Sequence, residues 1–239
     1  MYVGCATDKG NYRPKNQDRV IAKKKYIQNH ELAIACVCDG IGSLIYSEIA
    51  SEMVTKGILN WIEGVARYYP LVMSKEELIE DLEVTIRELN DLVCEYKEET
   101  KIEVGCTMSL LCVVDKEYFT FHVGDSRIYY IQDRLIQLTQ DEVILRQKNG
   151  KEKYYLINYI GKNEHICIKR GKGKVERDAV YMICSDGLYK HLSYEDVSNI
   201  YQINSDTAME KISQSLIYLM MERGEKDNIS CAILKAENK

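Results

Sequence analysis

Four aspartates in this chain share one local setting, because each lies at the end of a short apolar run. Asp39 follows residues 33–38, Asp125 follows 119–124, Asp186 follows 180–185, and Asp227 precedes 229–234. Such runs predict buried strands, so each carboxylate would stand at a strand tip. Carboxylates without a companion histidine or thiolate suit hard cations such as Mg²⁺ or Mn²⁺. If the four converge, they could not all stay ionised without bound cations, because like charges repel at short range.

Three of these aspartates precede a residue that tolerates unusual backbone angles, in the pairs Asp39-Gly40, Asp186-Gly187 and Asp227-Asn228. Such a pair lets the chain bend around a ligand and present a backbone carbonyl to it. The same pairs are also typical of ordinary turns. On the pattern alone, a metal site and a set of unrelated turns are therefore both open.

The elements that would position these side chains follow from hydrophobic spacing. Strands are expected over residues 19–22, 31–38, 107–114, 118–123, 127–132, 136–139, 179–184 and 229–234. One helix is expected from Ile45 to Ile62. A second begins at Ser74, which forms a capping box with Glu77. A third is expected over residues 206–223, with Gly224 as the stop. The lysine-rich residues 23–25 and 169–174 are interpreted as solvated turns, and 142–174 shows little pattern. Because strands and helices are segregated along the chain, we expect an α+β fold in which helices cover antiparallel sheets.

Composition narrows the class of protein. The 239 residues show no linker composition and no repeat, so we expect a single domain over residues 1–239. The net charge of −5 argues against general nucleic-acid binding, and no apolar run is long enough to predict a membrane span. Nine cysteines are an odd number, and Cys36 and Cys38 are interpreted as reduced core residues. We therefore expect a cytoplasmic monomer that binds neither nucleic acid nor membrane.

Seven short motifs resemble, in order, those of the metal-dependent protein serine/threonine phosphatases, the type 2C class. They are residues 10–18 (GNYRPKNQD), 39–43 (DGIGS), 105–107 (GCT), 124–127 (GDSR), 138–141 (LTQD), 185–188 (SDGL) and 227–230 (DNIS). The resemblance runs from about residue 4 to residue 234. It implies a β-sandwich of two antiparallel sheets flanked by helices, a four-layer α-β-β-α arrangement with a metal centre at one edge.

The resemblance also implies roles for individual residues. Asp39 would bridge two Mg²⁺ or Mn²⁺ ions, the carbonyl of Gly40 would ligate one, and Asp186 and Asp227 would complete the other. Asp125 would hold a third ion together with Asp186. Arg13 would bind the substrate phosphate, which suits a planar bidentate donor. The residues expected next to these groups are Gln17, Asp18 and Asn228.

The activity implied is hydrolysis of phosphoserine and phosphothreonine on proteins, by an activated water and without a phosphoenzyme. The partners would be phosphorylated proteins, the substrates of a protein kinase. Among the departures from the family pattern, three bear on activity: Gln17 replaces a common glutamate, Ile41 a histidine that serves as general acid in many members, and Ser43 a glycine. These departures motivate an alternative, an inactive relative that binds phosphoproteins or senses metal. A cysteine-based phosphatase is excluded because no cysteine has an arginine six positions later.

Overall fold

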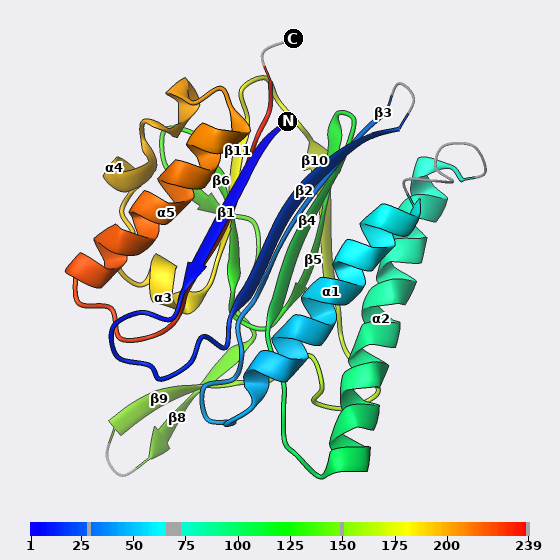
Figure 1. Ribbon diagram of the computed structural model, residues 1–239, viewed down its shortest axis with the longest axis vertical. Helices are drawn as coiled ribbons and strands as arrows, with labels where there is room; N and C mark the ends of the chain where they lie inside the picture. Colours follow the sequence, from blue (N-terminus) through cyan, green and yellow to red (C-terminus); the bar gives the residue numbers. More distant parts are fainter. Residues whose placement is uncertain (28–29, 66–72, 149–150, 238–239) are drawn as a thin grey trace.

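Two five-stranded antiparallel sheets form the centre of the computed structural model, which describes residues 1–27, 30–65, 73–148 and 151–237 (Figure 1). Sheet A contains, in spatial order, β1 (Tyr2–Asp8), β12 (Ile229–Lys235), β11 (Val180–Cys184), β6 (Arg127–Ile131) and β7 (Leu135–Gln137). Sheet B contains β10 (Lys169–Lys174), β5 (Glu117–Val123), β4 (Met108–Val114), β3 (His30–Cys38) and β2 (Arg19–Ile27). A separate antiparallel pair, β8 (Val143–Lys148) and β9 (Lys151–Leu156), lies beyond one end of the sheets.

Helices cover both outer faces of this sandwich. Helices α1 (Ser47–Val65) and α2 (Lys75–Thr100) lie on sheet B. Helices α3 (Asp186–Tyr189), α4 (Tyr194–Val197) and α5 (Asp206–Glu222), with the short 3₁₀ turn Ile200–Gln202, lie on the side of sheet A. The predicted four-layer α-β-β-α arrangement of an α+β fold is therefore confirmed. In the described part of the chain, no helix combines the length and the apolar character needed to cross a membrane.

Strand β3 shows how the sequence builds the layers. Successive side chains of a strand point to opposite faces. Leu32, Ile34, Cys36 and Cys38 pack under α1 and α2, whereas residues 33, 35 and 37 pack against sheet A. Cys36 and Cys38 are fully buried, so their interpretation as core residues is confirmed.

The long helices follow the spacing read from the sequence, with one difference. The Ser74 hydroxyl accepts a hydrogen bond from the backbone N–H of Glu77, and the Glu77 carboxylate accepts one from the backbone N–H of Ser74, so the predicted capping box begins α2. Gly224 follows α5 with a φ of +85° and acts as the predicted stop. Helix α1 begins at Ser47 rather than Ile45, and Ile45 is 74% exposed. The apolar side chain at that position therefore belongs to the loop and not to the buried stripe.

The interpretation of two lysine-rich stretches as turns is wrong. Residues 23–25 lie inside β2, paired with β3, and residues 169–174 form β10, paired with β5. Strand β10 is the last strand of its sheet, and edge strands tolerate lysines on their solvent side. Strands β8 and β9 also occupy the stretch that showed little pattern. Apolar periodicity cannot detect strands whose faces are largely solvated.

Candidate metal centre

The strand order brings the predicted aspartates to one end of the sandwich. Antiparallel pairing places the start of β2 beside the end of β3, and the end of β11 beside the start of β12. Strand β5 runs in the same direction as β3 because β4 is antiparallel to both, so these two strands end at the same edge. Asp18 precedes β2, Asp39 follows β3, Asp125 follows β5, Asp186 begins α3 after β11, and Asp227 precedes β12.

The five carboxylates face one another across the two sheets. The Ser230 hydroxyl of sheet A donates a 2.7 Å hydrogen bond to Asp18 Oδ2, which lies at the start of a sheet B strand. Asp39 lies close enough to the other four for each of them to raise its pKa, although burial is the larger cause. Asp18, which was expected next to the metal ligands, lies within the cluster itself.

Burial and mutual repulsion disfavour the ionised form of this cluster. Burial raises the pKa of Asp18 to about 7, and burial with the charge of Asp186 raises that of Asp125 to about 7. Burial also raises the pKa of Asp186, and Asp227 adds to that rise. Such a group of acids gains stability from any cation that it can bind, because opposite charge favours the carboxylate form.

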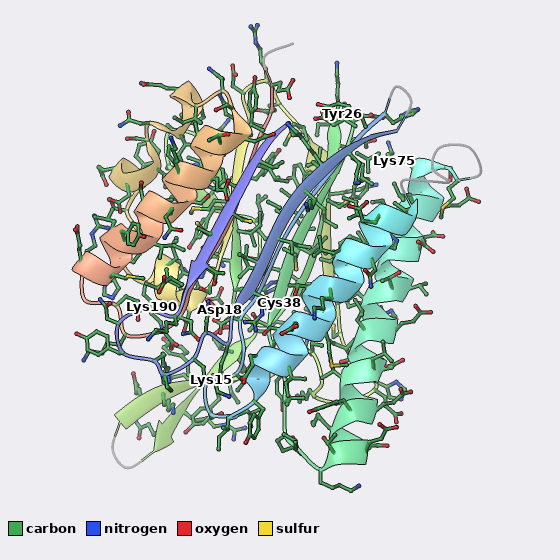
Figure 2. The ribbon with its side chains drawn as sticks, viewed as in Figure 1. Lys15, Asp18, Tyr26, Cys38, Lys75 and Lys190 are labelled. Atoms are coloured by element: carbon green, nitrogen blue, oxygen red, sulfur yellow. The ribbon has the colours of Figure 1, made fainter. Side chains whose placement is uncertain are left out.

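Two cationic side chains already contact the cluster. Arg13 Nη2 lies 2.7 Å from Asp227 Oδ2, and Lys190 Nζ lies 2.6 Å from Asp186 Oδ2. Figure 2 shows Lys190 and Asp18 at the same end of the sandwich. The Arg13 side chain is 40% exposed, so it can be reached from solvent.

The donor set fits a hard divalent cation in type and in charge. Asp18 Oδ1 is buried and has no hydrogen-bond partner, which leaves an acceptor inside the cluster to be satisfied. A buried acceptor without a partner is costly unless a cation or a water satisfies it. Within the residues that the structure describes, no three His, Cys, Asp or Glu side chains already stand at the spacing of a metal site. A bound metal ion would therefore require local adjustment of the predicted ligands Asp39, Asp125, Asp186 and Asp227.

Two glycines next to the aspartates are needed for close approach and not for unusual backbone angles. A Cβ on Gly40 would lie 2.7 Å from both the Cβ and the carbonyl oxygen of Gln17. A Cβ on Gly187 would lie 2.1 Å from the carbonyl oxygen of Asn228. Neither glycine has a positive φ, so the backbone-angle argument drawn from the sequence is wrong for both. Their absent side chains let the segments that carry the aspartates touch.

Asn228 fixes the loop that carries Arg13. Its Nδ2 donates 2.9 Å hydrogen bonds to the carbonyl oxygens of Lys9 and Lys15, and its Oδ1 accepts one from the backbone of Gln17. The predicted place of Asn228 beside the site thus has a physical basis. Gln17 uses its side-chain amide to donate a 2.8 Å hydrogen bond to the carbonyl of Leu44.

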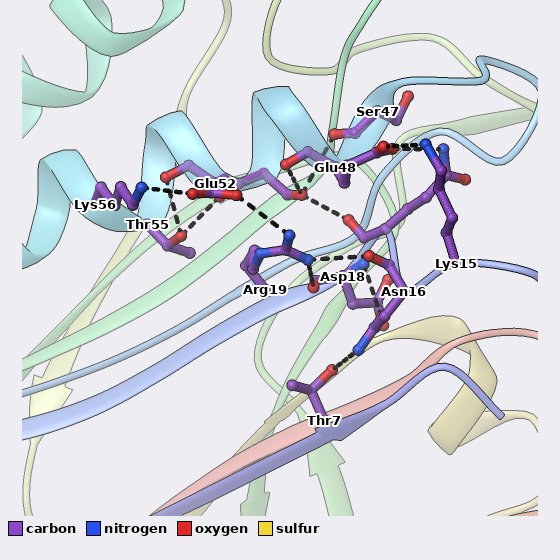
Figure 3. Close-up of polar contacts among 12 residues, drawn as sticks. Thr7, Lys15, Asn16, Asp18, Arg19, Ser47, Glu48, Glu52, Thr55 and Lys56 are labelled. Carbon is purple, nitrogen blue, oxygen red and sulfur yellow. Dashed lines mark hydrogen bonds and ion pairs between the residues drawn. The ribbon is translucent and has the colours of Figure 1, made fainter.

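Further contacts hold the same loop against its surroundings (Figure 3). Asn16 Nδ2 donates to Thr7 Oγ1 at 2.8 Å, and Lys15 Nζ lies 2.8 Å from Glu48 Oε1 at the start of α1. Arg19, the next residue after Asp18, donates to two backbone carbonyls of residues 16 and 18. The loop is therefore anchored to both sheets and to a helix, which limits the positions that Arg13 can take.

Arg127 ties α3 to the strands behind it. Its guanidinium donates to both carboxylate oxygens of Asp141 and stacks over the ring of Tyr189, 3.7 Å from the ring centroid. Because α3 runs from Asp186 to Tyr189, this stack holds the helix that carries Asp186. On the other side, Thr107 Oγ1 accepts a 3.1 Å hydrogen bond from the backbone of Asp39.

Lys190 is the functional candidate that the sequence analysis did not identify. The available signal was its spacing, because a lysine four residues after an aspartate on a helix can reach its carboxylate. The signal was missed because no helix was predicted between the strand ending at residue 184 and the helix beginning at residue 206.

Ile41 supplies no titratable group, and its backbone N–H donates to the Gly105 carbonyl at 3.0 Å.

The fold and the site together define a class of protein: a four-layer sandwich of two antiparallel sheets that gathers acidic side chains and one arginine at one end. Comparison with known proteins gives the particular family. Residues 14–219 match the family described as Protein phosphatase 2C, so the chain belongs to that family. The chain is 25% identical to the protein phosphatase PhpP of Streptococcus pneumoniae, over 98% of this chain and 97% of that protein.

Solved structures share the fold. The serine/threonine phosphatase of S. agalactiae has a TM-score of 0.80 and 23% sequence identity, covering 98% of this chain and 99% of that one. The catalytic domain of the serine/threonine protein phosphatase PstP, in complex with two manganese ions, has a TM-score of 0.75 and 22% identity, covering 97% and 96%. The chain is thus homologous to serine/threonine protein phosphatases over its full length.

Proposed function

We propose that this protein hydrolyses phosphoserine and phosphothreonine on proteins, as a single catalytic domain with two or three bound Mg²⁺ or Mn²⁺ ions. The observation that carries the proposal is the cluster of five aspartates around a buried, unpartnered carboxylate oxygen of Asp18, beside a partly exposed arginine. Family membership and the two manganese ions in the PstP structure support it.

The roles proposed for the acidic residues follow the family resemblance. Asp39 would contact two ions, with the Gly40 carbonyl on one and Asp186 and Asp227 on the other, while Asp125 would help to hold a third. When bound, such ions supply positive charge and lower the pKa of a coordinated water towards neutrality. The buried Asp18 accepts a hydrogen bond from Ser230 and would in this way support Asp39 beside it.

Arg13 would orient the substrate. Its guanidinium can donate two parallel hydrogen bonds to phosphoryl oxygens, and in phosphoryl transfer most of the catalytic effect comes from positioning and from neutralising charge. Without substrate, Arg13 donates to Asp227, so phosphate would compete with that carboxylate. The hydrogen bonds of Asn228 to the loop would keep the Arg13 guanidinium beside the acidic cluster.

The partners would be phosphorylated proteins that a protein kinase has modified. We place the enzyme in the cytoplasm, because all nine cysteines are free and six of them are buried thiols that pack as small apolar groups. We expect it to act as a monomer. Specificity for particular proteins would come from the loops around the acidic end of the sandwich.

The decisive experiment measures hydrolysis of a phosphothreonine peptide and of p-nitrophenyl phosphate by the purified protein, with Mn²⁺, with Mg²⁺ and with EDTA. We expect turnover that requires metal and is abolished in Asp186→Asn and Asp39→Asn. Asp133→Asn is the matched control, because Asp133 is exposed in the turn between β6 and β7. Silence of the wild type with Mn²⁺ demonstrably bound would favour the alternative, an inactive phosphoprotein-binding or metal-sensing relative. Undiminished Mn²⁺ binding by Asp39→Asn would contradict the metal assignment.

A further inference from the structure

Lys190 occupies an unusual position for a surface lysine. It lies at the end of α3, four residues after Asp186, and its backbone N–H donates to the Asp186 carbonyl while its Nζ lies 2.6 Å from Asp186 Oδ2. The side chain is 47% exposed, and its contact with Asp186 places the ammonium at the acidic cluster. Both ends of the residue are therefore tied to the same aspartate.

The ammonium acts on two carboxylates of the cluster. It contacts Asp186 directly, at 2.6 Å, and it lies close enough to Asp125 to act on the charge of that carboxylate. Lys190 therefore brings one positive charge to both side chains.

We propose that Lys190 is a tethered cation that serves Asp125 and Asp186 in place of a divalent ion, so that the acidic cluster holds two divalent ions and not three. This inference rests on the proposed function, because it concerns the metal centre of that same site. The physical reason is that an ammonium is a compact point charge with three donors, which can neutralise and hydrogen-bond a carboxylate as a hydrated cation would.

A second cation between the same two carboxylates would be disfavoured on two grounds. It would have to displace the ammonium from Asp186 Oδ2, and it would be repelled by the charge that remains nearby on a covalently attached stem. Lys190 cannot diffuse away, so its effective concentration at Asp186 exceeds that of any free ion at ordinary concentrations. Lys190 is thus a positioning residue that orients Asp186 and sets the number of ions.

The test counts Mn²⁺ bound per chain by titration followed with electron paramagnetic resonance of the free ion, with calorimetry for the affinities. We expect the wild type to bind two ions, and Lys190→Gln to bind a third with a dissociation constant at least tenfold lower than any third binding by the wild type. Lys190→Arg keeps the charge and should bind two. Lys172→Gln, on the exposed edge strand β10, makes the same charge change away from the site and should also bind two.

The position of the additional ion is tested by adding Asp125→Asn to Lys190→Gln, which should return the count to two. Equal numbers and affinities in the wild type and Lys190→Gln would overturn the inference, as would three tightly held ions in the wild type. These results leave the proposed function standing if the wild type hydrolyses phosphopeptide with metal. A wild type that binds no Mn²⁺ and shows no turnover would instead reject the proposed function and this inference together.

Discussion

Adding one methyl group at Gly187 should separate the two segments that carry Asp186 and Asp227. A Cβ at this position would lie 2.1 Å from the Asn228 carbonyl oxygen and 3.1 Å from its carbonyl carbon. These atoms belong to the backbone, so no side-chain rotation can relieve the overlap, and either α3 or the start of β12 has to move. Overpacking of this kind costs about 1–3 kcal/mol. For a chain of this size, each kcal/mol lowers the melting temperature by roughly 2–4 °C.

The assay compares Gly187→Ala with Gly64→Ala in urea unfolding and in Mn²⁺ calorimetry. Gly64 lies in α1, and nothing stands within 4 Å of its hypothetical Cβ, so alanine there should leave stability unchanged or raise it by up to about 1 kcal/mol. We expect Gly187→Ala to lose stability and also to bind Mn²⁺ more weakly, because Asp186 shifts with α3. A Gly187→Ala protein that matches Gly64→Ala in both measurements would refute the close-approach argument.

Three further outcomes are expected. First, in EDTA the unfolding free energy should fall as pH rises from about 4 through about 7, because a carboxyl group with a raised folded-state pKa holds its proton more tightly when folded. Asp125→Asn should weaken this pH dependence in urea titrations. A variant with the same pH dependence as the wild type would contradict the assignment to Asp125. Second, Mn²⁺ at 100 times its dissociation constant should raise the unfolding free energy by about 2.7 kcal/mol per site, and thermal melts of Asp186→Asn should show a smaller gain. Third, Arg127→Lys should lose the two-oxygen contact with Asp141 and the stack on Tyr189, which costs roughly 1–3 kcal/mol in urea unfolding; wild-type stability would show that the contact is not needed.

The parts of the fold that the sequence predicted are those with strong apolar spacing. Examples are strands β3 and β11 and the long helices α2 and α5. Each buries apolar side chains at regular spacing, and this spacing can be recognised in the sequence. Strand β10, with the sequence KRGKGK, buries almost nothing and is held by pairing with β5. A pairing partner more than 40 residues away along the chain cannot be read from local spacing.

The site divides in the same way. Each aspartate could be placed at a strand end from its own neighbours, but their convergence depends on which strands pair, and the sequence supported that only through family resemblance. The functions of Gly187 and Lys190 depend on contacts made after α3 forms. The helical turn of α3 is only four residues long, too short for apolar periodicity to reveal it.

The acidic cluster is held together by packing that has nothing to do with charge. Asp39 follows Cys38 and Asp186 follows the strand that ends at Cys184, and both cysteines are fully buried in separate cores. The carboxylates cannot move apart without disturbing these cores, and close-packed interiors resist such displacement. The repulsion between the carboxylates must therefore be reduced by bound protons, by the charges of Arg13 and Lys190, or by divalent ions. Because the fold forces the acids together before any ion arrives, the repulsion that remains in the metal-free protein is released on binding and adds to metal affinity.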